Sequence, residues 1–132
     1  MNYLLDTHIL IWSLLDSEKL SKTILDIISN QENKIFVSTV SLWEISIKYK
    51  LGKLTFDNFE PNLLFEYMKQ LGFDFITLEP LETLNSYKLP LVENHKDPFD
   101  RLLIYQAIKR DLIIISKDNK FIEYSNVGLK LL

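Results

Sequence analysis

The stretch Tyr3-Leu4-Leu5-Asp6 is followed directly by the apolar run Thr7–Trp12. A short apolar segment that ends in a carboxylate is typical of a buried parallel strand. The last residue of such a strand emerges at the carboxyl edge of the sheet, where open α/β folds bind their ligands. We therefore predict that Asp6 lies at the ligand-binding edge of a sheet and that other acidic residues converge on it.

Length and composition restrict the class of protein. The chain has 132 residues, of which 47% are hydrophobic, enough for one domain (residues 1–132) with an ordinary core. Its net charge of −3 is unlike that of a non-specific DNA-binding protein, and the lack of cysteine excludes disulfides and thiolate zinc sites. No apolar run is long enough for a membrane span and no charged leader precedes one, so we expect a soluble, cytoplasmic protein.

Strand-like and helical patterns alternate along the chain. Strands are predicted at residues 3–6, 35–38, 73–77, 112–115 and 127–132. Helices are predicted at residues 7–15, 21–30, 41–51, 61–71, 80–88 and 98–110. This alternation predicts an α/β fold with a mainly parallel sheet covered by helices on both faces.

Asp6 and Asp118 each follow a predicted strand. Asp118 comes shortly after the continuous apolar strand 112–115. If the two strands are neighbours at the switch point of the sheet, both carboxylates face one crevice. Each residue also has an ordinary alternative: Asp6 as the N-cap of the helix that starts at Thr7, and Asp118 as a turn aspartate.

Glu44 interrupts a predicted helical stripe that includes Ile47 and Leu51. A carboxylate on an apolar stripe is costly unless it is paired or binds a cation. The alternative is an exposed pair with Lys48, four residues later, which is worth a few tenths of a kcal/mol. Glu44 is therefore either a ligand that faces the interior or part of an ordinary surface pair.

Asp97 and Asp100 open the longest predicted helix. Asp97 is well placed as the N-cap and Pro98 as the first helical residue. The negative charge of Asp100 in the first turn would interact favourably with the helix dipole. Asp100 also lies at the edge of an otherwise apolar face of this helix, where an acid needs a further reason. We therefore interpret Asp97 as mainly structural and Asp100 as functional.

Clustered carboxylates repel one another, and oxygen-rich clusters of this kind usually bind hard cations such as Mg²⁺ or Mn²⁺. The sequence has no cysteine nucleophile, no glycine-rich phosphate loop and no GxSxG motif. The two histidines have no zinc-site spacing. We expect His8 to pack beside the site and His95 to be a loop residue near the substrate.

Together these segments resemble a PIN domain, and more narrowly the VapC-type toxins of bacterial toxin–antitoxin pairs. The resemblance covers the whole chain and rests on five segments: Leu5-Asp6-Thr7-His8, Leu42-Trp43-Glu44-Ile45, Leu51-Gly52-Lys53-Leu54, His95-Lys96-Asp97-Pro98-Phe99-Asp100-Arg101-Leu102-Leu103 and Ser116-Lys117-Asp118. It implies a three-layer α/β/α sandwich with a five-stranded parallel sheet in the order 3-2-1-4-5. It also implies a Mg²⁺- or Mn²⁺-dependent endoribonuclease, a VapB-like antitoxin partner and a homodimer.

The resemblance assigns the catalytic, metal-binding acids to Asp6, Glu44, Asp100 and Asp118. Asp97 belongs to the motif of the narrower subgroup, and its catalytic share is left open. Metal ions in such a site activate a water that hydrolyses the phosphodiester bond. Arg101 and Lys117 are candidates to bind RNA phosphates, with solvated surface charge as the alternative for both.

Rival functions have weaker support in the sequence. A receiver domain needs an aspartate at the end of strand three, where the chain has Ile76-Thr77. A haloacid-dehalogenase-type phosphatase needs a second acid two residues after the first, where the chain has His8. The remaining alternative is a non-catalytic PIN-like RNA-binding or scaffolding domain, which would be expected to lack part of the acidic quartet.

Overall fold

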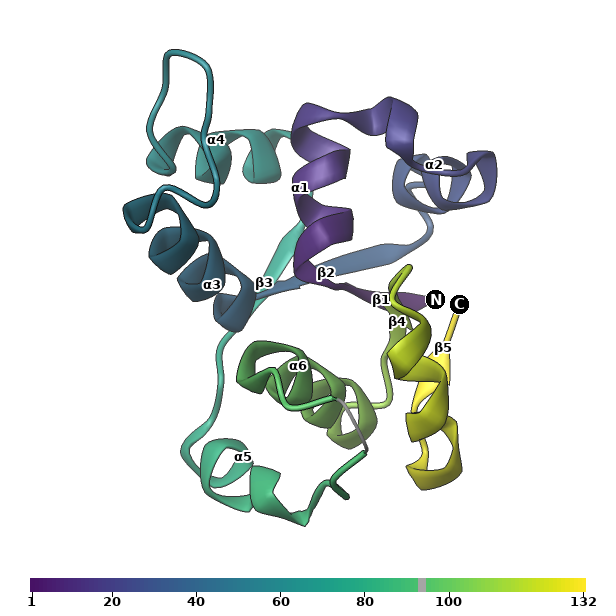
Figure 1. Cartoon of the computed structure of the whole chain (residues 1–132). Coiled ribbons are helices and arrows are strands. Elements are labelled where there is room, and N and C mark those ends of the chain that lie inside the picture. Colours follow the sequence, from purple (N-terminus) through teal and green to yellow (C-terminus); the bar gives the residue numbers. More distant parts are fainter. Residues whose placement is uncertain (93–94) are drawn as a thin grey trace.

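The structure is a computed structural model that describes residues 1–92 and 95–132. Five strands form one parallel sheet in the order β3-β2-β1-β4-β5, which confirms the predicted topology (Figure 1). The strands are β1 (Asn2–Leu5), β2 (Lys34–Ser38), β3 (Asp74–Ile76), β4 (Ile113–Ile115) and β5 (Lys130–Leu131). The first strand thus lies at the centre of the sheet, between β2 and β4.

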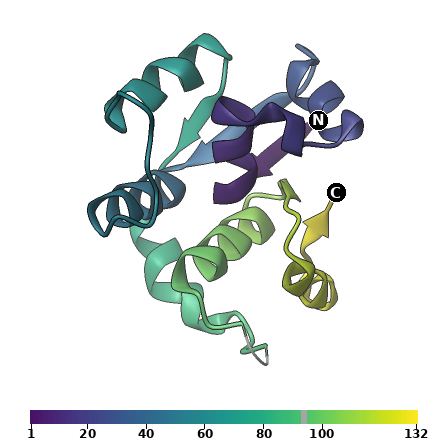
Figure 2. The ribbon, with the colours of Figure 1, turned by 45° about the horizontal axis from the view of Figure 1, so that its top comes forward.

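Helices cover both faces of the sheet. They are α1 (Thr7–Leu15), α2 (Lys22–Ser29), α3 (Thr39–Lys50), α4 (Asn62–Gln70), α5 (Pro80–Asn85) and α6 (Pro98–Lys109), with 3₁₀ segments η1 (Ser17–Lys19), η2 (Ser86–Lys88) and η3 (Asn119–Val127). Helices α1, α2 and α4 lie on one side, and α5, α6 and η3 lie on the other (Figure 1, Figure 2). Within the described ranges, no helix has the length and apolarity needed to cross a membrane.

The alternation of side chains along β1 divides the core into two clusters. Tyr3 and Leu5 are buried in the cluster with α1, α2 and α4, whereas Leu4 is buried in the cluster with α6 and η3. Successive side chains of a strand point to opposite faces, so a central strand with helices on both sides is apolar throughout. This explains why the apolar run at the start of the chain indicates the fold so strongly.

Helix α3 lies beside the sheet and contributes side chains to both core clusters. Val40 packs with α6 and Ile45 packs with α1 and α4. The helix begins at Thr39, two residues earlier than predicted, because the Ser38 hydroxyl caps it by accepting a hydrogen bond from the Val40 backbone N–H. This position brings α3 between α1 and α6, the two helices that follow and precede the central strands.

The end of the chain differs from the prediction. A strand over residues 127–132 is wrong for its first half, because η3 continues to Val127 and Gly128 then adopts a left-handed conformation with φ of 102°. Only Lys130 and Leu131 pair with β4. The turn at Gly128 redirects the chain from η3 back to the edge of the sheet.

Candidate functional site

The register of the two central strands brings two acids to one edge of the sheet. Leu5 of β1 pairs with Ile115 of β4, and the Asp6 backbone N–H donates to the Ile115 carbonyl over 3.1 Å. Asp6 and Asp118 therefore leave neighbouring strands at their carboxyl ends, as expected for a switch point. Their negative charges interact, since Asp118 contributes to raising the pKa of Asp6.

Asp6 combines both roles that the sequence left open. Its Oδ1 accepts a hydrogen bond from the Ile9 backbone N–H over 2.8 Å, which makes it the N-cap of α1. It is also buried at the sheet edge, and this burial raises the pKa of its carboxyl above the usual value, against hydrogen bonds from Ser116 and Ile9. The N-cap fixes the carboxylate in place, and the burial makes its negative charge unfavourable without a cation nearby.

Glu44 of α3 is 2% exposed and faces the interior. Its Oε2 forms an ion pair with Lys48, while its Oε1 is buried without a hydrogen-bond partner among the described residues. The predicted pair with Lys48 and the predicted inward orientation thus coexist. The stripe proposed through Leu51 is wrong, because Leu51 is 62% exposed and the buried neighbours of Glu44 are Ser41 and Ile45.

The start of α6 separates a capping acid from a buried one. Asp97 is exposed, and its Oδ1 accepts hydrogen bonds from the Phe99 and Asp100 backbone N–H groups over 2.8 and 3.1 Å. Burial, together with the negative charges of Asp97 and Glu44, raises the pKa of Asp100 to about 6, against the lowering effect of the His95 hydrogen bond. Asp97 therefore stabilises the helix start, whereas Asp100 carries an unfavourable charge in the site.

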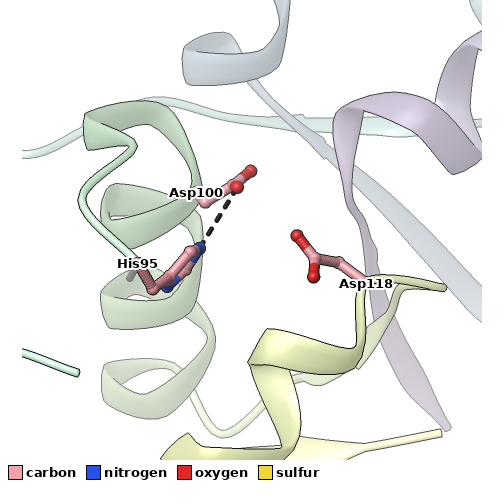
Figure 3. Close-up of side chains that lie close together, drawn as sticks. All are labelled: His95, Asp100 and Asp118. Carbon is pink, nitrogen blue, oxygen red and sulfur yellow. Dashed lines mark hydrogen bonds and ion pairs between the residues drawn. The ribbon is translucent and has the colours of Figure 1, made fainter. Parts of the chain in front are cut away.

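Three side chains converge at this edge. Each of His95, Asp100 and Asp118 offers one candidate ligand atom, and these atoms lie within 4.8 Å of one another (Figure 3). Asp118 points across the gap toward Asp100 from the turn before η3, and its Oδ1 also accepts the Lys120 N–H as the N-cap of that segment. Among the described residues, Asp6 and Glu44 are not part of this cluster. They are linked to it by charge, because Asp118 raises the pKa of Asp6 and Glu44 raises that of Asp100.

His95 is more than the loop residue near the substrate that the sequence indicated. It is 2% exposed, with Nε2 3.3 Å from Asp100 Oδ2 and Nδ1 2.7 Å from the Tyr124 hydroxyl. An ionised Asp100 carboxylate can only accept a hydrogen bond, so the Nε2 of His95 carries the proton and donates to it. In the neutral imidazole Nδ1 is then the acceptor, and the Tyr124 hydroxyl donates to it. No local pattern predicts the contact, because Tyr124 lies 29 residues away.

The two candidate RNA-binding cations are engaged within the protein. The Arg101 guanidinium donates to the Leu89 and Pro90 carbonyl oxygens over 2.8 and 2.9 Å, and so holds the segment before α6. The Lys117 ammonium donates to the Lys19 carbonyl oxygen over 2.9 Å and remains exposed. A role in binding RNA phosphates stays a prediction for both residues.

The donor set fits a divalent cation. The unpartnered Glu44 Oε1 is an oxygen that needs a partner, and the raised pKa values of Asp6 and Asp100 mark two more carboxylates whose charge is uncompensated. Asp118 adds a half-buried carboxylate opposite Asp100. Hard cations such as Mg²⁺ and Mn²⁺ prefer such oxygen ligands, and His95 orients one of them from behind.

Comparisons with known proteins give a family and a fold. The sequence matches the PIN domain family over residues 3–127. No curated protein matches it. Similar solved structures are VapBC2 from Rickettsia felis bound to a promoter DNA fragment (17% identity, TM-score 0.65, covering 100% of this chain and 98% of that chain) and VapBC-1 from nontypeable Haemophilus influenzae (16%, 0.66, 100% and 97%). A third is VapBC-5 from Mycobacterium tuberculosis, of the VapBC family of toxin–antitoxin systems (13%, 0.63, 99% and 97%).

Proposed function

The chain belongs to the PIN domain family, and we propose that it is a metal-dependent endoribonuclease, the toxin of a VapBC-type toxin–antitoxin pair. In this proposal Asp6, Glu44, Asp100 and Asp118 form the catalytic site and hold Mg²⁺ or Mn²⁺. The reaction is hydrolysis of an RNA phosphodiester bond. PIN domains are generally nucleases, which supports the reaction class, and the acidic site supports the metal.

The observation that carries the proposal is the convergence of carboxylates that their partners within the protein compensate only in part. Burial raises the pKa of Asp100 to about 6, and Glu44 keeps a buried oxygen without a partner among the described residues. A purely structural cluster would be expected to pair its charges, because unpaired buried charges destabilise a fold. Perturbed carboxylates that share one edge of a sheet are instead typical of an active site.

The bound cation would polarise the scissile phosphate and lower the pKa of a bound water. The protein's own residues supply the geometry. Asp6 is fixed by its N-cap bond to Ile9, and Asp100 is oriented by the N–H of His95. Glu44 contributes a buried oxygen without a partner among the described residues and lies near enough to Asp100 to raise its pKa. Asp118 contributes a carboxylate that faces Asp100. Ser116 and Thr7 neighbour Asp6 and are candidates to orient the attacking water.

The proposed partners follow from the same assignment. The similar structures from Rickettsia felis and Haemophilus influenzae are named as VapBC complexes, and the one from Mycobacterium tuberculosis is named as a toxin–antitoxin system. For this chain we propose a VapB-like antitoxin, a homodimeric toxin and a cytoplasmic location. Arg101 and Lys117 are proposed to contribute positive charge near the RNA, in addition to the internal hydrogen bonds they make.

The test is cleavage of a labelled RNA pool by antitoxin-free protein with added Mg²⁺ or Mn²⁺. Parallel reactions contain EDTA, or the Asp100→Asn variant in place of the wild type. We expect cleavage that requires the metal and that the variant loses, while thermal unfolding shows that the variant is folded.

Each other outcome has a definite meaning. Cleavage that survives in Asp100→Asn would indicate a contaminant or a different site. Absence of cleavage with either metal, together with no heat of metal binding in calorimetry, would instead support the non-catalytic RNA-binding or scaffolding alternative.

A further inference from the structure

A second concave surface lies beside the acidic site, between α1 and the segment that follows α3. It has a volume of about 530 Å³ and is lined by His8, Trp12, Lys19, Lys48, Lys53 and Thr55, among others. We call it the Trp12 groove. None of the four acids of the proposed active site lines it, so its chemistry is separate from that of the metal site.

Positive charge gathers in the Trp12 groove, although the protein as a whole is acidic. Three lysines line the groove, against a single carboxylate, that of Asp16. Lys19 pairs with Asp16 and Lys48 pairs with Glu44, whereas Lys53 is exposed and forms no ion pair with the described residues. The net charge of the chain is −3, so this local excess of cations differs from the protein as a whole. Such a patch attracts a polyanion.

An aromatic wall accompanies the cations. The Trp12 indole is half-buried, with the His8 ring 6.1 Å away at an interplanar angle of 53°. Two ammonium groups lie against the indole: Lys19 Nζ is 5.8 Å and Lys117 Nζ is 5.7 Å from the ring centroid. Cations beside a partly exposed indole resemble the surfaces that bind single-stranded nucleic acid, where bases stack on aromatic rings and phosphates contact lysines.

The groove is continuous with the site through two residues. Thr7 lines the groove and directly follows Asp6, and Lys48 lines the groove while its ammonium contacts Glu44. A strand whose scissile phosphate lies at the acids can therefore extend along α1 toward Trp12. The groove lies next to the acidic site, where the nucleotides that flank the cut would pass.

We propose that the Trp12 groove binds the single-stranded RNA that flanks the scissile phosphate. One base stacks against Trp12, and the ammonium groups of Lys19, Lys53 and Lys117 contact backbone phosphates. The proposal rests on the proposed ribonuclease function, because it assigns a substrate to the surface beside that site. In this proposal the phosphate that Lys117 contacts lies beside Trp12.

The experiment measures binding of a fluorescein-labelled single-stranded RNA of mixed sequence by anisotropy. The antitoxin-free full-length chain carries Asp100→Asn, so that the probe stays intact. Trp12→Ala should weaken binding roughly 10-fold, as expected for loss of one stacked base. Lys53→Ala should lower the slope of log affinity against log salt by about 0.7, the value for one phosphate contact on a single strand.

Matched controls lie away from the groove. Lys34→Ala removes an exposed lysine at the opposite, amino edge of the sheet, and Tyr87→Ala removes an aromatic ring that is 78% exposed on η2. Both should bind the probe as the parent does. Trp12→Phe keeps an aromatic face and should retain most of the affinity, which separates stacking from a folding defect. Thermal unfolding of every variant accompanies the binding curves.

The outcomes separate this proposal from the proposed function. If the Trp12 and Lys53 variants bind the probe like the parent, the groove proposal is overturned. The proposed nuclease function is then still tested separately, by metal-dependent cleavage with the wild type. If they keep RNA affinity but fail to retain a co-expressed antitoxin, the groove takes a protein segment and the proposal is again wrong. If they lose affinity while the wild type cuts nothing, the groove binds RNA but does not serve a cleavage site, and both the nuclease assignment and the assignment of the groove to flanking nucleotides are wrong.

Discussion

The charged side chains at the two ends of α6 differ in how well their charges are paired. At the amino end, Asp100 is partly buried near other acids, and its pKa is raised to about 6. At the carboxyl end, Arg110 forms two hydrogen bonds to Glu82 over 2.6 and 2.8 Å and donates to the Thr77 carbonyl over 2.7 Å. The hydrogen bonds from Arg110 lower the pKa of Glu82. Among the described residues, Asp100 forms no ion pair with a lysine or arginine, whereas Glu82 pairs with Arg110.

This difference separates a functional cluster from a structural one. The Glu82–Arg110 pair joins α5 to the end of α6, and each charge meets its partner. The acids at the amino end stay close together although their repulsion and burial oppose folding. Local violations of the rules that stabilise a fold are expected at functional sites. We therefore propose that the chemistry lies at the amino end of α6, whereas the ion pair at the carboxyl end contributes to stability.

The largest expected effect comes from the same substitution in an acid that neighbours each end. Glu44 of α3, whose charge acts on Asp100, has a buried Oε1 without a hydrogen-bond partner among the described residues. Glu44→Gln should lower kcat/KM for RNA cleavage more than roughly 100-fold, since even indirect partners of metal ligands account for 10–100-fold. Glu82→Gln should leave cleavage nearly unchanged. Initial rates with saturating Mn²⁺ measure both. Wild-type rates for Glu44→Gln would remove Glu44 from the site.

The pH dependence of stability should have opposite signs at the two ends. The folded protein binds the Asp100 proton more tightly than the unfolded chain does, because the pKa rises from 3.8 to about 6. The stability that this residue contributes is present below about pH 4 and is lost as the pH rises through about 6, a change of roughly 2–3 kcal/mol. The raised pKa of Asp6 acts in the same direction. Glu82, with its lowered pKa, instead contributes stability that is lost as the pH falls.

Urea unfolding of metal-free protein in EDTA measures this dependence. The free energy of unfolding of the wild type should gain less between about pH 4 and pH 6 than that of Asp100→Asn, because the variant lacks the group that opposes folding when charged. Parallel curves for the two proteins over this range would contradict the raised pKa of Asp100 and the contrast drawn from it.

The sequence predicts the fold and the positions of the acids better than it predicts the contacts between side chains. The central strand, the alternation of elements and the strand-end acids follow from local patterns, because apolar runs and caps depend on near neighbours. Asp6, Asp97 and Asp118 all act as N-caps in the structure. This role is the alternative interpretation of Asp6 and the main interpretation of Asp97, whereas the alternative for Asp118 is only an ordinary turn aspartate. Capping and a place at the sheet edge turned out to be compatible, since one carboxylate has two oxygens.

The contacts that the sequence does not reveal are long-range ones between side chains. Glu82 and Arg110 are 28 residues apart, and His95 reaches Tyr124 across 29 residues. No periodicity in the chain relates these positions. Arg101 illustrates the same limit, because only the folded chain brings the Leu89 and Pro90 carbonyl groups to its guanidinium. Pattern analysis therefore finds the acids but not the groups that orient them.

A smaller effect is expected on stability at the carboxyl end. Glu82→Gln loses the charge-assisted pair with Arg110, whose side chains are 13% and 28% exposed, and should cost about 1–2 kcal/mol of the free energy of unfolding. Asp111→Asn is the matched control. It breaks an exposed pair with Lys130 and keeps a residue type that tolerates the positive φ of 56° at this position, so it should cost less than about 0.5 kcal/mol. Equal losses in urea unfolding would contradict the structural role of Glu82.

The last prediction concerns the residue that orients Asp100 at the amino end of α6. His95 donates to Asp100 from behind, so it is a positioning residue rather than a carrier of the reaction. His95→Gln keeps a polar side chain but loses the fixed ring that Tyr124 and Phe121 hold, and should lower kcat/KM roughly 10-fold and raise the Mn²⁺ concentration for half-maximal activity. Tyr124→Phe should act in the same direction, and the double variant should be no worse than His95→Gln alone, because both changes break one chain of hydrogen bonds. A loss as large as that of Glu44→Gln would instead make His95 a direct ligand, and the amino end of α6 would then hold its cation with a nitrogen as well as with carboxylate oxygens.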